Sequence, residues 1–569
     1  MEQADLIWSQ YQKGLSYIRS TGLDDEWIEC EKFWEGEQWP KATDRTRSFP
    51  RPVVNVCSMI ADNKKSGILS EKIKIIYRPD EMFGDMLERA NHGANIFTKF
   101  CENVQQELEQ ENLDDEAVEN LVKLGTAIYH YYWDNDVSGG MTTPYLGGMR
   151  GEILHPKNVI VSNFREKDIQ KQKYIIIASV ESLSSVKELA KKNGVKNYDQ
   201  IKADNEIDDE ATKVLETCTV LTRYTRKNNK VVWSKSTQNV MIQEPTYWEP
   251  GLNEVKLDEE DYKNDGSEIK EPDKAEQKEI FNRKQLYPIE LQSYKNRKDC
   301  IYGIGEVKQC IANNKAINFN LAMMLLSVQQ TAWPKIIQKA GALARQVITN
   351  APGEIITDNS KTQGWGIQYL NTPGFNAQAL TLTDNILNLT RSTTGATEVV
   401  TGEVLGANMA ASAIIALQNQ AKKPIETAQK KFFRSHIRIG RIIEQFFKCY
   451  YTDDRLFSYE EDQQTYTSQM NGSNYSDIDF STNIEVGARG VFSESLIISL
   501  LDQLLQQQAI DVDDYIELYP DSIMTFKETL KKMRAKKLEE QQMQEFLMNQ
   551  QMLNQPQMQQ PIENVAQPV

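Results

Sequence analysis

The sequence feature that most constrains this 569-residue chain is a long helical pattern between Met409 and Tyr451. Apolar residues recur there at helical spacing, which predicts the longest helix of the protein. Pro424 lies inside the pattern and predicts a kink, because proline has no amide hydrogen to donate to the preceding turn. The predicted apolar side of this helix consists of Ile425, Phe432, Ile439, Ile443 and Phe446.

The opposite side of the same helix is basic. Residues 422–441 contain seven Lys and Arg residues and a single acid, Glu426. The basic residues that share one side at helical spacing are Lys423, Lys430, Arg434, Arg438 and Arg441. This row runs against the formal charge of the whole chain, which is −16. A chain this acidic is expected to bind nucleic acid poorly, because phosphate neutralisation needs clustered Lys and Arg.

The rest of the chain mixes helical and strand patterns, which predicts an α+β, helix-rich fold. Predicted helices cover residues 8–36, 53–68, 81–108, 114–124, 182–193, 305–331, 378–391, 493–508 and 522–544. Predicted strands cover residues 72–77, 127–133, 151–161, 219–226, 230–234, 239–244, 286–293 and 478–486. The last segment, 541–569, holds ten glutamines and four methionines without apolar periodicity, so we predict a disordered tail.

Cysteine usage and hydropathy exclude several classes of protein. The seven cysteines are scattered and none forms a CxxC pair, so we expect reduced, mostly buried thiols without a disulfide framework or a zinc site. The first five residues are acidic, where a targeting segment would be basic, and the apolar runs are far too short to cross a bilayer. We therefore expect a protein that is made and kept in a cytoplasm, without membrane contact.

Six segments stand out in order along the chain. They are FWEGEQWP (33–40), RPVVNVCSMIADNKKSGILSEKIKIIYRP (51–79), ILHPKNVIVSN (153–163), YPIELQSYKNRKDCIYGIGEVKQCIANNKAINFNLAMMLLSVQQTAWPK (287–335), GANMAASAIIALQNQAKKPIE (406–426) and VFSESLIISLLDQLLQQQ (491–508). Together they resemble the portal proteins of tailed double-stranded DNA bacteriophages, over roughly residues 27–533. No single motif is diagnostic, and the resemblance rests on their succession.

The resemblance implies a subunit with a wing, a two-helix stem, a clip and a short helical crown, assembled into a ring. It assigns 1–180 to the N-terminal wing, 181–213 to the first stem helix region, 214–300 to the clip, 301–333 to the second stem helix, 334–350 to the wing, 351–376 to a tunnel loop, 377–510 to long helices and the C-terminal wing, and 511–540 to crown-like helices. The clip includes an acidic excursion, 254–276, with ten acidic and four basic residues.

The implied function is a head-to-tail connector at one capsid vertex, through which DNA is packaged and ejected. The implied location is the virion, with assembly in the host cytoplasm. Twelve copies of a chain of charge −16 would carry about −190, which suits a conduit that repels phosphate. The alternative is that the negative charge only keeps the protein soluble. The implied partners are further copies in a ring of twelve, double-stranded DNA as cargo, the terminase large subunit, the major capsid and scaffolding proteins, and head-completion or tail adaptor proteins.

Candidate site residues follow from this reading. Lys308 and Lys315 lie seven apart on one predicted helix face, where they would form rings in the channel or salt bridges between subunits. The candidates for channel contact on the glycine-rich loop are Trp365, Gln368 and Asn371. The candidates for terminase or adaptor docking are Glu259, Glu260 and Asp261. The basic row on the longest helix would face DNA or an acidic surface of a neighbouring subunit, or would simply be solvated.

Three acidic triplets, at 24–26, 114–116 and 208–210, are predicted to open helices rather than to bind metal, because acids favour the positive end of the helix dipole. The chain has no GxxxxGK[ST] loop, no HExxH and no GxSxG, so we expect no enzyme, no catalytic residues, no cofactor and no metal. The alternatives are a virion adaptor or scaffolding ring without a DNA channel and, less favoured, a carboxylate-dependent nuclease.

Overall fold

The computed structural model has a mixed α+β fold in which about half of the residues are helical. It describes residues 2–534, except for 45, 48, 81–85, 138–145, 205–215, 254–283, 333–335, 339–366, 370–377, 396–410, 462–463, 489–490, 508, 520–529 and 531–532. The chain divides into a first compact unit, residues 1–69 and 73–486, and a second, residues 70–72 and 487–569. The described helices of the second unit are α12 (Val491–Gln506) and α13 (Val512–Leu518).

The centre of the first unit is a three-stranded antiparallel sheet. Its strand order is β3 (Gly148–Ile153), β2 (Thr126–Asp134) and β9 (Ile289–Ser293). Two helices pack against this sheet, α5 (Gln110–Leu124) on β2 and β3 and α11 (Ala411–Cys449) on β9. All five apolar residues predicted for one side of α11 are buried, so this part of the prediction is confirmed.

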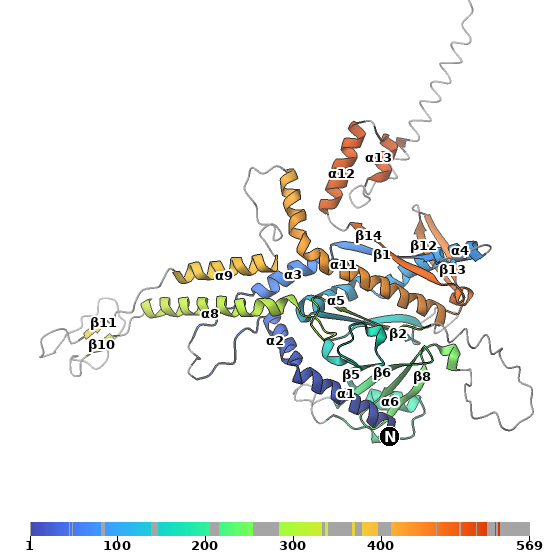
Figure 1. The fold of residues 1–569 in the computed structure, drawn as a ribbon, viewed down its shortest axis with the longest axis horizontal. Coiled ribbons are helices and arrows are strands. Elements are labelled where there is room, and N and C mark those ends of the chain that lie inside the picture. Colours follow the sequence, from blue (N-terminus) through green and yellow to red (C-terminus); the bar gives the residue numbers. More distant parts are fainter. Residues whose placement is uncertain are drawn as a thin grey trace, which may run out of the picture. The chain divides into compact units, whose positions relative to one another are not determined.

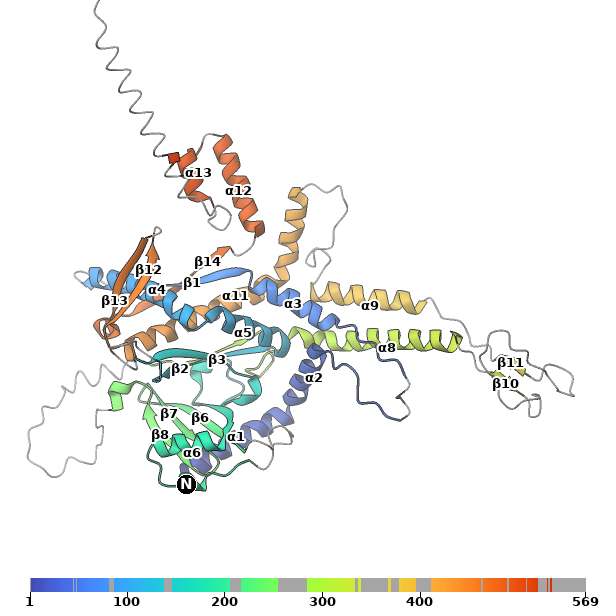
Figure 2. The ribbon, with the colours of Figure 1, turned by 180° about the vertical axis from the view of Figure 1, so that it is seen from behind.

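The longest helix, α11, changes direction along its length (Figures 1 and 2). Pro424 lies within it and removes one backbone hydrogen bond, which accounts for a bend. The predicted kink therefore agrees with the structure.

A second sheet has five antiparallel strands. They are, in order, β4 (Val159–Val161), β5 (Tyr174–Ser182), β6 (Thr217–Lys227), β7 (Lys230–Ser236) and β8 (Met241–Tyr247). The turn between β6 and β7 is Asn228-Asn229, both at positive φ, as a two-residue hairpin loop requires. A short helix, α6 (Leu183–Lys192), packs on β5, β6 and β8 through its own small core.

The range 214–300 is the one expected to form the clip, and two of its described strands pair with strands from outside the range. β5 pairs along its full length with β6, and β9 joins β2. The described strands of that range therefore complete sheets begun by earlier residues. In the range 181–213, the described residues contain α6 and one 3₁₀ turn, and α6 packs on the sheet instead of pairing with another long helix.

The N-terminal residues form three helices, α1 (Glu2–Ser20), α2 (Leu23–Glu35) and α3 (Val56–Ile68). The single helix expected over 8–36 is interrupted at Gly22, which has φ 70°. Glycine adopts this left-handed conformation without strain, so α1 ends there and α2 begins anew. The triplet 24–26 occupies the first turn of α2, so its predicted role as a helix start is confirmed.

Two helices, α8 (Glu306–Ala332) and α9 (Gln378–Thr394), lie side by side (Figures 1 and 2). Asn313, early in α8, donates to Thr390 Oγ1, late in α9, at 2.9 Å, so the two helices are antiparallel. Between them in sequence, β10 (Ile336–Gln338) pairs with β11 (Ile367–Tyr369). The antiparallel partner of α8 is therefore α9, rather than a helix from 181–213.

The remaining elements of the first unit pack around aromatic side chains that include Phe97, Phe100, Phe447 and Phe457. β1 (Glu71–Pro79) pairs with β14 (Phe480–Ala488), and the hairpin of β12 (Arg455–Glu461) and β13 (Gln464–Met470) packs on α4 (Met86–Glu107).

Among the described helices, none has the length and apolarity that a bilayer crossing requires. The short 3₁₀ turns are Pro156–Asn158, Ile169–Lys171, Tyr198–Gln200, Pro250–Asn253 and Gly472–Tyr475.

Candidate functional site

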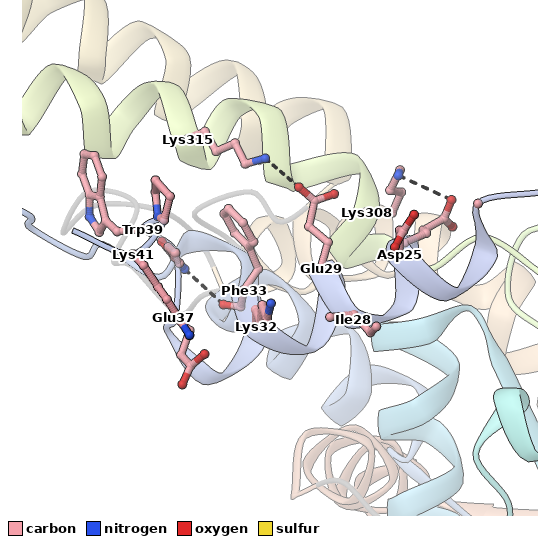
Figure 3. A pocket seen from close by; sticks show the side chains of 14 residues that line it. Asp25, Ile28, Glu29, Lys32, Phe33, Glu37, Trp39, Lys41, Lys308 and Lys315 are labelled. Carbon is pink, nitrogen blue, oxygen red and sulfur yellow. Dashed lines mark hydrogen bonds and ion pairs between the residues drawn. The ribbon is translucent and has the colours of Figure 1, made fainter. Parts of the chain in front are cut away.

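Lys308 and Lys315 lie on the part of α8 that adjoins α2, as Figure 3 shows. Lys315 Nζ is 2.6 Å from Glu29 Oε1, and Lys308 Nζ is 3.4 Å from Glu26 Oε2. The two lysines thus share a face, as their spacing predicts, and both pair with acids of the same chain. The alternative of salt bridges between subunits is not needed to neutralise them.

These residues border a cleft of about 870 Å³ between α2, the loop that follows it, and α8 (Figure 3). Phe33 and Trp39 supply its aromatic walls. Its charged residues are four acids and four lysines: Asp25, Glu26, Glu29, Glu37, Lys32, Lys41, Lys308 and Lys315. Because the charges balance, the cleft offers no net field that would select an anionic or a cationic ligand.

A buried amide network lies at the same junction. Gln38 Oε1 accepts hydrogen bonds from the side-chain amides of Asn314 and Asn318 of α8. Asn314 Oδ1 accepts from the amide of Val56 at 2.9 Å, and Gln38 Nε2 donates to Asn55 Oδ1 at 3.0 Å. The network joins residues from three of the segments that carry the family resemblance, so it explains why polar residues occur at these buried positions.

One side of α8 carries an apolar row whose members are exposed or half-exposed in the described structure. We call it the outer stripe; its members, spaced four, three, four and three residues apart, are Ala312, Ala316, Phe319, Met323 and Leu326. Phe319 is 57% exposed and Met323 is 50% exposed. This spacing is that of a helix-packing seam, which in most proteins faces a partner helix.

Other apolar residues of the helix pair are also exposed. Leu325 and Val328 are large exposed residues of α8 that fall about opposite the outer stripe at 100° per residue. On α9 the large exposed residues include Leu382 and Leu389. The pair α8–α9 therefore presents uncovered apolar surface on more than one side, which is unusual for a monomeric protein.

The five basic residues predicted to share one side of α11 are all exposed. We call this row the basic stripe. Lys430 contacts Glu426 of its own helix at 3.4 Å, and Arg438 contacts the Glu290 carboxylate at 3.4 Å. Within the part of the chain that the structure describes, no hydrogen bond or ion pair is made by Lys423, Arg434 or Arg441.

Glu290 is buried in the sheet beneath α11, and burial raises its pKa to about 8 although the Arg438 guanidinium acts to lower it. This carboxyl group therefore keeps its proton over much of the neutral range. Next to it, Lys431 is turned inward, and its amine donates to the carbonyl groups of Ser293 and Tyr294. Burial lowers the pKa of Lys431, with Lys167 acting in the same direction.

Of the other predicted site residues, only Gln368 falls within the described residues, where it pairs with Ile337 in the β10–β11 ladder. Trp365 and Asn371, and the proposed docking acids Glu259, Glu260 and Asp261, lie outside the described residues. The predicted tunnel loop, 351–376, is therefore represented by β11 alone. The triplet 208–210 also lies outside the described residues.

The triplet 114–116 does not start a helix, because α5 begins at Gln110. Asp114 instead accepts hydrogen bonds from Tyr129 at 3.0 Å and from Gln110 at 2.8 Å, and it pairs with the buried His436 of α11 at 3.1 Å. Burial lowers the pKa of His436, but the Asp114 carboxylate and the Phe432 carbonyl raise it above its ordinary value. This pair joins α5 to α11, and no local sequence pattern predicts it.

The described residues contain no group of three or more His, Cys, Asp or Glu side chains that could hold a metal ion. All seven cysteines are free thiols, six of them buried, as expected.

Comparison with known protein families finds no matching family, and no curated protein sequence matches the chain.

Proposed function

We propose that this chain is the portal subunit of a tailed double-stranded DNA bacteriophage. In this proposal, identical copies form a ring at one capsid vertex, and DNA enters and leaves through its bore. The large terminase docks on the ring during packaging and head-completion or tail adaptor proteins dock afterwards, while capsid and scaffolding proteins surround it. The segment resemblance suggests this function, and one structural observation supports it.

That observation is the uncovered apolar surface on opposite sides of α8. Full burial of a Phe or Met side chain contributes about 1.5–3 kcal/mol. Phe319 and Met323 are already about half buried, so covering the remainder contributes roughly half of that for each residue. A two-fold dimer covers a single self-complementary patch, whereas a head-to-tail ring gives each subunit two neighbours. Leu325 and Val328, about opposite the outer stripe, provide the surface that a second neighbour would cover.

The stem of the proposed portal is then the α8–α9 pair. The clip remains proposed for residues 214–300. The acidic balance of the chain, −16, suits a bore that passes a polyanion without holding it.

The test is the assembly state of the purified chain. Mass photometry and negative-stain imaging of the wild type should find a ring with a central hole. Phe319→Glu with Met323→Glu should yield monomers, because each new carboxylate would have to be desolvated in the interface. The matched control is Val180→Glu with Leu456→Glu, which places the same charges on exposed apolar residues elsewhere and should leave the ring intact.

A wild-type chain that stays monomeric at every concentration and salt condition would overturn the proposal. A closed particle without a bore would instead favour an adaptor or scaffolding ring. A metal-dependent phosphodiesterase assay on the same sample distinguishes the nuclease alternative, which requires duplex cleavage.

A further inference from the structure

The basic stripe of α11 lies opposite a row of buried apolar residues on the same helix. Ile439, Ile443 and Phe446 on its opposite side are each at most 1% exposed. The stripe is therefore held on a rigid support, and from Lys423 to Arg441 it extends about 27 Å at 1.5 Å per residue. Four of its members, from Lys430 to Arg441, follow one another at steps of about 4.5 to 6 Å along the axis.

The charges of the stripe are available to a partner. Lys423, Arg434 and Arg441 make no ion pair or hydrogen bond among the described residues. Lys430 is 68% exposed, and its pair with Glu426 on the same helix is a solvent-screened contact of small energy. Arg438 pairs with the buried Glu290 at 3.4 Å and lies 3.9 Å from Asp168, so its charge is partly compensated within the chain.

A neighbouring loop extends the basic surface beyond one helix. Lys167 is exposed and lies close enough to act on Lys431 of α11, and Arg165 is exposed two residues earlier. Asp168, which follows Lys167, is 3.9 Å from Arg438. The patch thus has cations from two elements, in a chain whose total charge is strongly negative.

Three acids on neighbouring helices already have partners within the chain. Glu26 and Glu29 of α2 pair with Lys308 and Lys315, and Asp115 of α5 pairs with Lys65. These three acids are neutralised within the chain, so they are not free to pair with the basic stripe of another copy. A DNA duplex, by contrast, presents one charge per about 1.7 Å of axis without interruption. The guanidinium groups of the stripe also match phosphate oxygens in bidentate geometry.

We propose that the basic stripe of α11, together with Lys167 and Arg165, binds the phosphate backbone of double-stranded DNA without sequence preference. This inference rests on the proposed function, in which the ring handles a duplex, and it adds where the subunit touches that duplex. The contact is weak and depends on salt, because the charge of the remaining chain opposes it.

The experiment measures binding of a fluorescent 30-base-pair duplex by anisotropy at several KCl concentrations. The test variant is Lys430→Gln, Arg434→Gln and Arg441→Gln in the full chain. The control variant, Lys191→Gln, Lys192→Gln and Lys196→Gln, removes the same charge from exposed residues at the end of α6 and just beyond it. The test variant should bind at least tenfold more weakly than the control at low salt, with a slope of log K against log [salt] reduced by about 2.7.

Equal DNA affinity in the two variants would overturn the inference. Loss of the ring in the test variant alone, seen by mass photometry on the same samples, would also overturn it, because the stripe would then face an acidic surface of a second copy. The inference and the proposed function fail separately: a monomeric wild type removes the portal, while the difference in DNA affinity between the variants is still measured.

Discussion

Two long helices of the first unit, α8 and α11, differ in how far their apolar residues are buried. In α11 the apolar side packs on the central sheet and on neighbouring helices, and its exposed side is basic. In α8 one side packs on α2, α3 and α5, while the outer stripe and the residues opposite it remain uncovered. The comparison teaches that the described part of the chain covers the apolar side of α11, whereas it leaves large apolar residues of α8 exposed.

A pair of matched substitutions tests whether the two helices differ in this way. Phe432→Ala in α11 should lower the free energy of unfolding by about 3–5 kcal/mol, because Phe432 is 2% exposed and its loss leaves a cavity. Phe319→Ala in α8 should change the unfolding free energy of the dissociated subunit by no more than about 0.5 kcal/mol. Urea denaturation of dilute, dissociated protein measures both. Similar losses for the two variants would show that α8 is already covered in the single chain.

A pH series tests the protonation of the Glu290 carboxyl group, which is buried beneath α11. The pKa of Glu290 is raised from 4.5 to about 8, so between these values the folded protein holds a proton that the unfolded chain has released. The unfolding free energy should therefore fall as pH rises through this window. Glu290→Gln should flatten that dependence, while Glu188→Gln, an exposed control on α6, should not. Denaturation midpoints at about pH 5, 6.5 and 8 test this, and identical pH slopes in all three proteins would contradict it.

The smallest expected effect concerns the lysines of α8. Lys315→Gln removes the ion pair with Glu29, but Lys315 is 54% exposed, so solvent screens most of the attraction. The unfolding free energy should fall by about 0–1 kcal/mol. A thermal melt of the dissociated subunit measures this. A loss near that of Phe432→Ala would mean that this pair, rather than the buried amides, holds α2 against α8.

Parts of the fold could be predicted closely from sequence. The helices predicted at 53–68, 305–331 and 378–391 correspond to α3, α8 and α9 within a few residues. The strands predicted at 219–226, 230–234 and 239–244 correspond to β6, β7 and β8. The long-range pairings were not predicted: β6 with β5, β9 with β2, and α8 with α9.

The same division holds for the candidate site. Periodicity within one segment was enough to assign both sides of α11 and the shared face of Lys308 and Lys315, since those properties depend on neighbours three to seven residues away. The partners of these residues were decided by the tertiary structure alone. Lys315 meets Glu29, Asp114 meets His436, and Gln38 meets Asn314 across separations of 286, 322 and 276 residues. Such contacts leave no local pattern, because they form only where distant segments pack together.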